Sequence, residues 1–365
     1  MLNFELERDA NRFNGEPSLK KSGIKLTERE RLVLRTIIHN YILSAEPLGS
    51  RALARRYHID LSPATIRNTL ADLEDMGLLT HAHTSAGRVP TDLGYRIYVD
   101  DMMQVEEISV EVRRTISETI ANFSPATGEL YNRVSELLSE VSRMLAVIVV
   151  PDLSSGELHK IEIVRVAHGR IMVIVVIKSG MVNTILLELD SEIIDTDIQQ
   201  AMQLINQRLS GVRLSDIRVE IGKRLQNGIA TKNAIIRLFL DFPEKIFDFK
   251  RNQEMHIGST RPILEQPEFK TTDKLKGIIE LIEDRDIIVH LLKDRVEGVK
   301  VTIGNENEGN RLKDFSVITS TYRIQDELGT LGIIGPTRMN YSRLVALVDY
   351  TAQLVTSKAD RSRQI

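Results

Sequence analysis

The sequence predicts a multidomain α+β protein, because different hydrophobic patterns follow one another along the chain. Its 365 residues exceed what one hydrophobic core usually holds, so we expect two or three domains. Apolar residues recur at helical spacing in residues 27–103, whereas residues 144–189 contain short apolar runs separated by glycine-containing turns. Helical spacing returns in residues 192–240, and strand patterns resume at residue 299.

Composition restricts the chemistry that the chain can perform. It contains no cysteine, which excludes disulfides, thiol catalysis and cysteine-bound zinc. The formal net charge is -3, so nucleic-acid binding would need a local basic patch. The longest apolar runs, residues 144–150 and 171–177, are only strand-length, and the N-terminus has no apolar stretch typical of a signal peptide. We therefore expect a soluble, cytoplasmic protein.

The first structured element is predicted to begin near residue 25. Residues 1–24 are polar with few apolar residues, and we expect a disordered extension there. Thr27 and Glu30 have the spacing of a capping box at a helix N-terminus. An apolar stripe follows, and Pro47-Leu48-Gly49 ends the helix. The stripe consists of Leu34, Ile37, Ile38, Tyr41 and Ile42.

Two shorter helices and a hairpin are predicted next. Ser50 is expected to cap a second short helix. After a turn at residues 58–61, Ser62 caps a third helix with Pro63 in its first position. Gly77 ends the third helix, whose buried stripe consists of Ile66, Leu70 and Leu73. Residues 78–80 and 89–90 form the arms of the hairpin, and a further helix runs from Thr91 through Met103. Three helices followed by a hairpin predict a winged helix-turn-helix domain over residues 25–103.

The third helix carries side chains suited to reading DNA bases. In a major groove, Arg67 can form paired hydrogen bonds with guanine, and Asn68 can do so with adenine. Ser62, Ala64 and Thr65 lie in the first turn, where they could touch phosphate or a thymine methyl group. The acids Asp72, Glu74 and Asp75 follow, and they oppose the helix dipole and would repel phosphates. We therefore expect the helix to enter the groove by its N-terminal turn.

Positive charge gathers beside this helix. Between Pro47 and Arg67 there are four arginines and only Asp60 as an acid, a local charge of +3. Arg51, Arg55 and Arg56 lie on the second helix, placed for phosphates rather than bases. The tip of the hairpin is small and polar, with Thr84, Ser85 and Arg88, and it suits a DNA backbone or minor groove. The alternative is a protein–protein module whose arginines form a solvated face.

The remainder of the chain predicts an interrupted α+β domain. Residues 109–145 have helical spacing, and four strands at 144–150, 159–166, 170–177 and 182–189 are expected to form an antiparallel meander. Ile198, Met202, Ile205 and Leu209 form one stripe in the helical residues 192–240, and residues 241–272 are irregular. Strands follow at 299–303, 315–319, 322–324 and 330–334, with a last helix over 341–356. The simplest interpretation is one sheet built from residues 104–190 and 273–365, interrupted by a mainly helical insert at 191–272.

Other motifs that suggest chemistry lack the residues to perform it. His81 and His83 lie on one side of an extended strand, but no further metal ligands are evident. Gly329, Gly332 and Gly335 do not have the spacing of a dinucleotide-binding loop. No serine-hydrolase, P-loop or kinase motif is present. We expect no enzyme activity, no cofactor and no metal, although an enzyme with an appended DNA-binding domain is a weaker alternative.

Three motifs carry a family resemblance. The first runs from Ser62-Pro63-Ala64-Thr65-Ile66-Arg67-Asn68 through Gly77-Leu78-Leu79, and the second is His83-Thr84-Ser85-Ala86-Gly87-Arg88-Val89-Pro90-Thr91. The third comprises Ile303-Gly304 with Glu306-Asn307, and the segment from Gly329 to Tyr341. Together they resemble the bacterial heat-inducible transcription repressor family HrcA. The resemblance covers the chain from about Leu26.

The resemblance implies a function and an architecture. Members of this family are homodimeric repressors that bind double-stranded DNA at the CIRCE inverted repeat, upstream of chaperonin and DnaK operons, and are kept active by the GroEL chaperonin until heat shock. The family fold implies a winged helix, a GAF-like domain and an inserted dimerisation domain. It assigns DNA binding to Ser62, Thr65, Arg67, Asn68, His83, Thr84 and Arg88. The alternative is a ligand-gated regulator whose GAF-like domain senses a metabolite.

Overall fold

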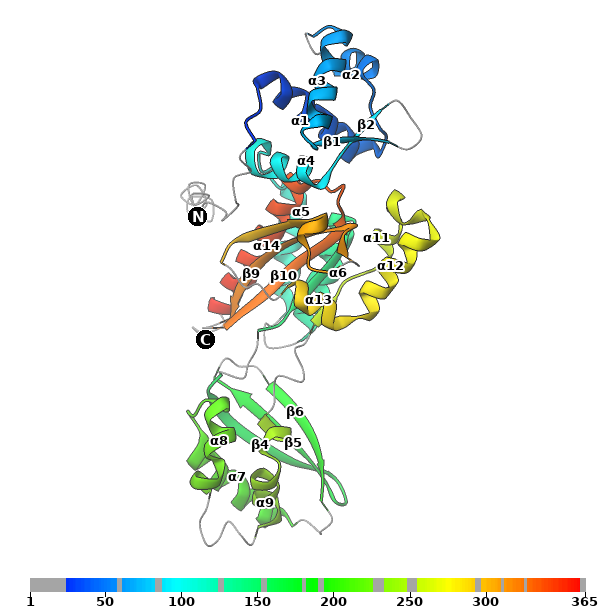
Figure 1. The fold of residues 1–365 in the computed structure, drawn as a ribbon. Coiled ribbons are helices and arrows are strands. Elements are labelled where there is room, and N and C mark those ends of the chain that lie inside the picture. The colour runs from blue at the N-terminus through cyan, green and yellow to red at the C-terminus, as the bar shows by residue number, and fades with distance from the viewer. Residues whose placement is uncertain are drawn as a thin grey trace, which may run out of the picture.

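The fold is that of a computed structural model, in which the elements lie in three tiers (Figure 1). It describes residues 24–57, 61–82, 87–123, 128–151, 156–178, 182–189, 194–225, 233–247, 255–292, 297–309, 312–324 and 327–361. We call residues 24–103 the head, the five-stranded sheet with its covering helices the body, and residues 156–247 the insert. Of the predicted extension at 1–24, residues 1–23 lie outside the described residues.

The head contains the predicted helices and hairpin. Its helices are α1 (Glu28–Ser44), α2 (Ser50–Tyr57) and α3 (Pro63–Asp75), followed by the antiparallel pair β1 (Leu79–His81) and β2 (Arg88–Pro90). The capping box of Thr27 and Glu30 is present, and Ser62 caps α3 with Pro63 in its first turn, so both predicted helix starts are confirmed. The helix after Thr91 is α4 (Asp92–Ile97), which continues as a π-helical turn, Tyr98–Met102.

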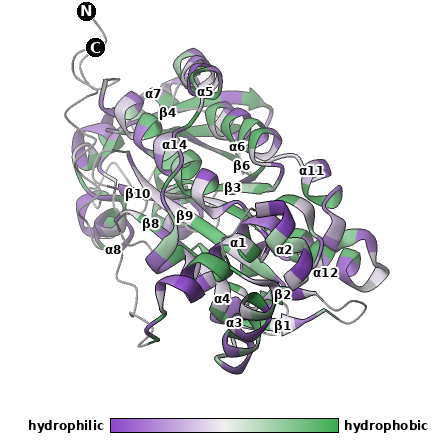
Figure 2. Ribbon diagram, turned by 90° about the horizontal axis from the view of Figure 1, so that it is seen from above, coloured by the Kyte–Doolittle hydropathy of each residue, from purple (hydrophilic) through white to green (hydrophobic). Residues whose placement is uncertain are grey.

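An antiparallel sheet with strand order β7-β3-β10-β9-β8 forms the body. In chain order these strands are β3 (Leu145–Val149), β7 (Met255–Ile257), β8 (Val299–Ile303), β9 (Phe315–Ile324) and β10 (Glu327–Pro336). One face is covered by α5 (Val110–Asn122), α6 (Gly128–Ser142) and α14 (Tyr341–Arg361). A second hydrophobic cluster on the other face includes residues of α11 (Arg261–Leu264), α12 (Thr272–Glu283) and α13 (Arg285–Leu291). Figure 2 shows the helices changing between hydrophobic and hydrophilic colours along their turns, as expected when one side is buried.

The insert has its own three-stranded sheet, ordered β4-β5-β6. The strands are β4 (Leu158–Ala167), β5 (Arg170–Ile177) and β6 (Val182–Glu188). The helices described beside them are α7 (Asp195–Leu209), α8 (Leu214–Leu225), α9 (Ala234–Asp241) and α10 (Pro243–Phe247). The predicted stripe on α7 is confirmed, since Ile198, Ile205 and Leu209 are buried and Met202 is partly buried against the same core.

Four sequence predictions about the strands and the insert are wrong. The four-strand meander fails at its first strand, because β3 pairs with β7 and β10 whereas β4, β5 and β6 pair with one another. The strands of residues 158–188 therefore belong with the helices of the insert, which is mixed rather than mainly helical. All five residues of β3 are buried, as in a central strand covered on both faces, whereas β4 buries only Leu158, Ile161 and Ile163. The predicted irregular segment also contains β7, and the two strands predicted within 315–324 are one.

Candidate nucleic-acid interface

Helix α3 presents a polar stripe along its exposed side. Its buried side consists of Ile66, Thr69, Leu70 and Leu73, which pack into the core of the head. The exposed side is formed by Ala64, Arg67, Asn68, Ala71, Asp72 and Asp75, spaced three and four residues apart. The side chains of Arg67 and Asn68 make no hydrogen bond or ion pair with any other described residue. The N-terminal half of this stripe carries Arg67 and Asn68 and no acid, whereas its C-terminal end carries Asp72 and Asp75.

Capping occupies the first turn of α3. The backbone N–H of Thr65 donates to Ser62 Oγ at 3.1 Å, and the two hydroxyls lie 2.9 Å apart. Ser62 Oγ thereby satisfies a backbone N–H that would otherwise be left without a partner at the helix start, and the Thr65 hydroxyl bonds the capping hydroxyl. Ser62 and Thr65 therefore have a structural role in addition to any contact with a ligand.

The predicted phosphate-binding arginines of α2 divide into two kinds. Arg51 and Arg55 are exposed, and their side chains have no partner among the described residues. Arg56 donates from Nη1 to Asn40 Oδ1 at 3.0 Å, and Tyr57 donates its hydroxyl to the same oxygen at 3.0 Å. Asn40 is only 2% exposed, so it ties α2 to α1 from within the head. Sequence reasoning missed Asn40, although a buried amide on a helix face usually has such a fastening role.

A cluster of Glu74, His81 and Arg88 fastens the hairpin to α3. Arg88 Nε lies 2.9 Å from Glu74 Oε2, and Arg88 Nη2 lies 2.8 Å from the same oxygen. His81 contacts both partners, with Nε2 3.1 Å from Glu74 Oε1 and Nδ1 2.9 Å from Arg88 Nη1. The structure thus places Arg88 at the base of the hairpin, bonded to the acidic end of α3. The predicted tip residues His83, Thr84 and Ser85 lie outside the described residues.

The segment before α2 supports the same hairpin. The backbone groups of Leu48 and Arg88 exchange hydrogen bonds, with N···O distances of 3.4 and 3.2 Å. Gly87 lies so close to this segment that an added Cβ would be 2.7 Å from Pro47 Cβ, which explains why only glycine fits there. Hydrogen bonds and ion pairs therefore hold the hairpin strands to the α1–α2 connection and to α3.

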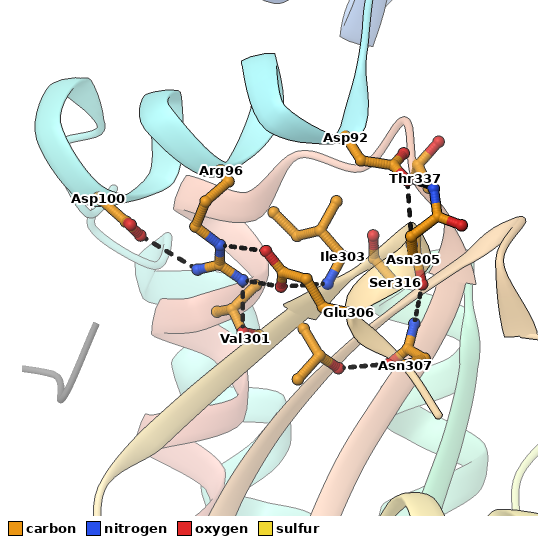
Figure 3. Close-up of polar contacts among 12 residues, drawn as sticks. Asp92, Arg96, Asp100, Val301, Ile303, Asn305, Glu306, Asn307, Ser316 and Thr337 are labelled. Carbon is orange, nitrogen blue, oxygen red and sulfur yellow. Dashed lines mark hydrogen bonds and ion pairs between the residues drawn. The ribbon is translucent and has the colours of Figure 1, made fainter. Parts of the chain in front are cut away.

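The opposite side of the head is joined to the body by paired charges, which Figure 3 shows in close-up. Arg96 of α4 donates from Nε to Glu306 Oε1 at 2.7 Å, from Nη2 to the carbonyl oxygen of Val301 at 2.8 Å, and from Nη1 to Asp100 Oδ1 at 3.1 Å. Asp92 Oδ2 accepts from the backbone N–H of Asn305 at 3.0 Å and from its Nδ2 at 2.8 Å. The turn that carries Asn305 and Glu306 follows β8.

Burial changes the proton affinities in this joint. Burial opposes the charge on Arg96, but its hydrogen bonds with Glu306 and Asp100 outweigh that effect and raise the guanidinium pKa. Burial raises the pKa of Asp100 more than the Arg96 hydrogen bond lowers it. Asp100 Oδ2 is buried and has no hydrogen-bond partner among the described residues. Keeping both Arg96 and Asp100 charged therefore costs free energy, because the buried charges lose their contact with water.

A second arginine joins the body to the far end of α1. Arg338 donates from Nη1 to the carbonyl oxygen of Ile42 at 2.5 Å, and it also bonds Gln266 at 3.2 Å and Glu268. Beside it, the rings of Tyr95 and Tyr341 lie 5.7 Å apart, and burial raises the pKa of Tyr95. The motifs around residues 304–307 and 336–341, which the sequence offered only as a resemblance, thus lie at the joint between head and body.

A cleft of about 600 Å³ lies at this joint, lined by Thr91, Asp92, Leu93, Ile303, Asn305 and Glu306 among others. Asp92 bonds the amide of Asn305, and Glu306 bonds Arg96, so the polar side chains at the cleft bond one another. Nothing at the cleft favours the metabolite-sensor alternative. Within the described residues there is no group of three or more His, Asp or Glu side chains that could hold a metal ion, and no helix long and apolar enough to cross a membrane.

Comparison with known proteins identifies the family. Residues 128–345 match the family model described as HrcA protein C terminal domain. A protein of Chlorobium phaeobacteroides, named heat-inducible transcription repressor HrcA, is 38% identical over 90% of this chain and 96% of its own length. This chain belongs to the HrcA family. The HrcA repressor of Geobacter sulfurreducens is also 38% identical, over 91% of this chain and 97% of its own.

A solved structure supports the fold. It is described as that of a hypothetical protein, and it aligns with a TM-score of 0.61 at 20% identity over 93% of this chain and all of that one. At this identity the match concerns architecture only. This match confirms the sequence prediction of a multidomain fold that mixes helices and sheets.

Proposed function

We propose that this HrcA-family chain is a heat-inducible transcription repressor that binds double-stranded DNA through the outer side of its head. The observation that carries the proposal is the exposed stripe of α3, where Arg67 and Asn68 have no partner among the described residues. Arg and Asn are the side chains that read guanine and adenine edges in a major groove. Arg51 and Arg55 on the neighbouring α2 supply phosphate contacts, and Ala64 and Thr65 lie at the entering turn.

The repressor acts as a homodimer in this proposal. One head neutralises few phosphates, and a two-fold operator such as the CIRCE inverted repeat requires a two-fold protein. A homodimer is supported by the sheet of the insert, one face of which exposes a row of apolar residues. Val164, Met172 and Leu186 lie in one cross-strand row, and Val164 and Leu186 are 43% and 52% exposed. Such a row is typical of a surface that another subunit covers.

Dimerisation can be tested at this face. Leu186→Glu places a charge in the row and is expected to shift the mass measured by analytical ultracentrifugation to that of a monomer. Val219→Glu is the matched control, because Val219 is also an exposed apolar residue but lies on α8. An unchanged dimer in the Leu186 variant would show that subunits associate elsewhere.

Operator binding is tested by fluorescence anisotropy on a CIRCE-type inverted repeat. The control duplex has its half-sites moved by half a helical turn, and both are measured at two salt concentrations. We expect tight binding that is lost on respacing, because two linked heads must reach two half-sites together. Equal, salt-sensitive binding to both duplexes would contradict a sequence-specific dimer.

The family resemblance extends the proposal to control in the cytoplasm. It implies that the GroEL chaperonin keeps the repressor active and that heat-damaged proteins divert the chaperonin, which releases the chaperone operons. Adding GroEL to purified protein should therefore increase the fraction that binds the operator, and adding an unfolded competitor should reverse the gain. An active fraction that is independent of GroEL would remove this part of the proposal.

A further inference from the structure

We propose that the joint between head and body determines which operator spacing the repressor accepts, with Arg96, Glu306 and Arg338 as the positioning residues. The inference rests on the proposed function, because spacing has meaning only for two heads on paired half-sites. None of these side chains lies on the DNA-reading side of the head. They act by holding that side in one orientation relative to the body and the insert.

Two anchors far apart in the sequence hold the head. Arg338 reaches the carbonyl oxygen of Ile42 at the end of α1, and Arg96 of α4 reaches Glu306 and the carbonyl oxygen of Val301. A single contact would allow the head to pivot, whereas two contacts on different helices oppose rotation. The segment that follows the head is also bonded to the body, since Ser342 Oγ of α14 donates to the carbonyl oxygen of Gln104 at 2.8 Å.

Because both arginines are largely buried, breaking their hydrogen bonds costs free energy. The Arg96 side chain is 11% exposed, and each of the two arginines bonds three groups. Removing such an arginine leaves backbone carbonyl oxygens and the largely buried carboxylates of Asp100 and Glu268 without that partner. Domains joined by small polar contacts usually move relative to one another, but a joint in which two largely buried arginines each bond three groups opposes that motion.

The shape of the turn after β8 is adapted to this joint. Gly304 has φ +53°, and an added Cβ would lie 2.1 Å from Asp92 Oδ2. The buried Asn307 holds the turn from below, because its Nδ2 donates to the carbonyl oxygens of Gly304 at 3.1 Å and Phe315 at 2.8 Å. Asn305 and Glu306 are therefore presented to α4 by a turn with little freedom of its own.

A fixed head orientation converts operator spacing into affinity. The second head of a bound dimer engages its half-site at an effective concentration that depends on how well the geometry matches. Moving one half-site by about five base pairs turns it to the opposite side of the duplex, since a helical turn takes about 10 base pairs. Rigid heads lose the second contact on such a duplex, and loosely held heads recover part of it.

The test compares Glu306→Ala with wild type on three duplexes: the inverted repeat, the respaced repeat and a single half-site. The matched control is Glu118→Ala, which removes the acid of an exposed ion pair with Arg114 on α5, away from the joint. We expect Glu306→Ala to lower the affinity ratio between natural and respaced repeats at least fivefold, with single half-site affinity unchanged. Glu118→Ala should match wild type on all three.

A second, milder variant tests the same joint in case Glu306→Ala does not fold. Asn305 is exposed, and Asn305→Ala removes the Nδ2 contact with Asp92 while the backbone hydrogen bond remains, so we expect a smaller fall in the same ratio. If both variants keep the wild-type ratio while wild type discriminates spacing, the joint does not set spacing and the proposed function stands. If affinity for all three duplexes falls together, the role is only structural and the inference is overturned. If wild type itself does not discriminate, the proposed function fails and the inference fails with it.

Discussion

The two sides of the head use the same residue types in opposite ways. On the outer side, Arg55 and Arg67 are exposed and have no partner among the described residues. On the inner side, Arg96 and Arg338 each bond three groups at the joint with the body. A charge held ready for an external ligand stays solvated, whereas a charge with an architectural role is paired and desolvated. Whether an arginine is paired with other residues therefore distinguishes the outer arginines from those of the joint, which residue type alone does not.

The largest expected effect comes from breaking the inner side. Arg96→Met leaves Glu306 and Asp100 without their cation, and we expect it to lower the free energy of unfolding by about 3 kcal/mol. Urea unfolding measures the loss. Arg114→Met, which breaks an exposed pair on α5, should cost less than about 0.5 kcal/mol. Similar losses in both variants would show that the joint contributes no more than a surface ion pair.

The outer side is expected to affect DNA binding and not stability. Arg67→Ala should cost about 1–3 kcal/mol of operator affinity and relax the preference at one base pair. Arg55→Ala should weaken binding to all sequences and reduce the slope of affinity against salt. Anisotropy on single-base operator variants measures both. The proposed orientation of α3 would be wrong if Arg67→Ala weakened all duplexes equally.

The fastening of the hairpin lies between these extremes. Glu74→Gln keeps the shape of the side chain but removes the charge that Arg88 and His81 share, and we expect operator affinity to fall by about 1 kcal/mol. Hydroxyl-radical footprinting should show weaker protection by the hairpin and unchanged protection by α3. Glu118→Gln is the control. Uniform weakening of the whole footprint would contradict a role confined to the hairpin.

The smallest effect concerns Asp100. Because the folded state raises its pKa, Asp100 stabilises the fold most below the ordinary carboxyl pKa, and this contribution is lost as pH rises through the raised pKa. Asp100→Asn removes that loss, so the stability of the variant relative to wild type should increase between pH 4 and pH 7. Thermal unfolding across this range measures the trend. Asp101→Asn, which removes a carboxylate from the exposed neighbouring position, is the control.

Local patterns were enough to predict much of the head. The capping box at Thr27, the Ser62-Pro63 start of α3 and the buried stripe of Ile66, Leu70 and Leu73 depend on residues within two turns of one another. The exposed position of Arg67 and Asn68 follows from the same periodicity. Backbone hydrogen bonds and side-chain spacing within a helix are local, so the sequence contains this information directly.

Only the tertiary structure decided which partners the remaining residues take. The apolar strand β3 could have paired with β4, which follows it in sequence, but it lies between β7 and β10, more than 100 residues away. Arg56 and Arg88 resemble Arg55 and Arg67 in sequence, yet Asn40 and Glu74 bind them. Glu306 and Arg338 show no function until folding brings them to α4 and α1. The sequence determined local helices and their faces, because those depend on near neighbours. Strand order and charge pairing depend on contacts that close long loops, and their energies are set by burial that no short pattern reports.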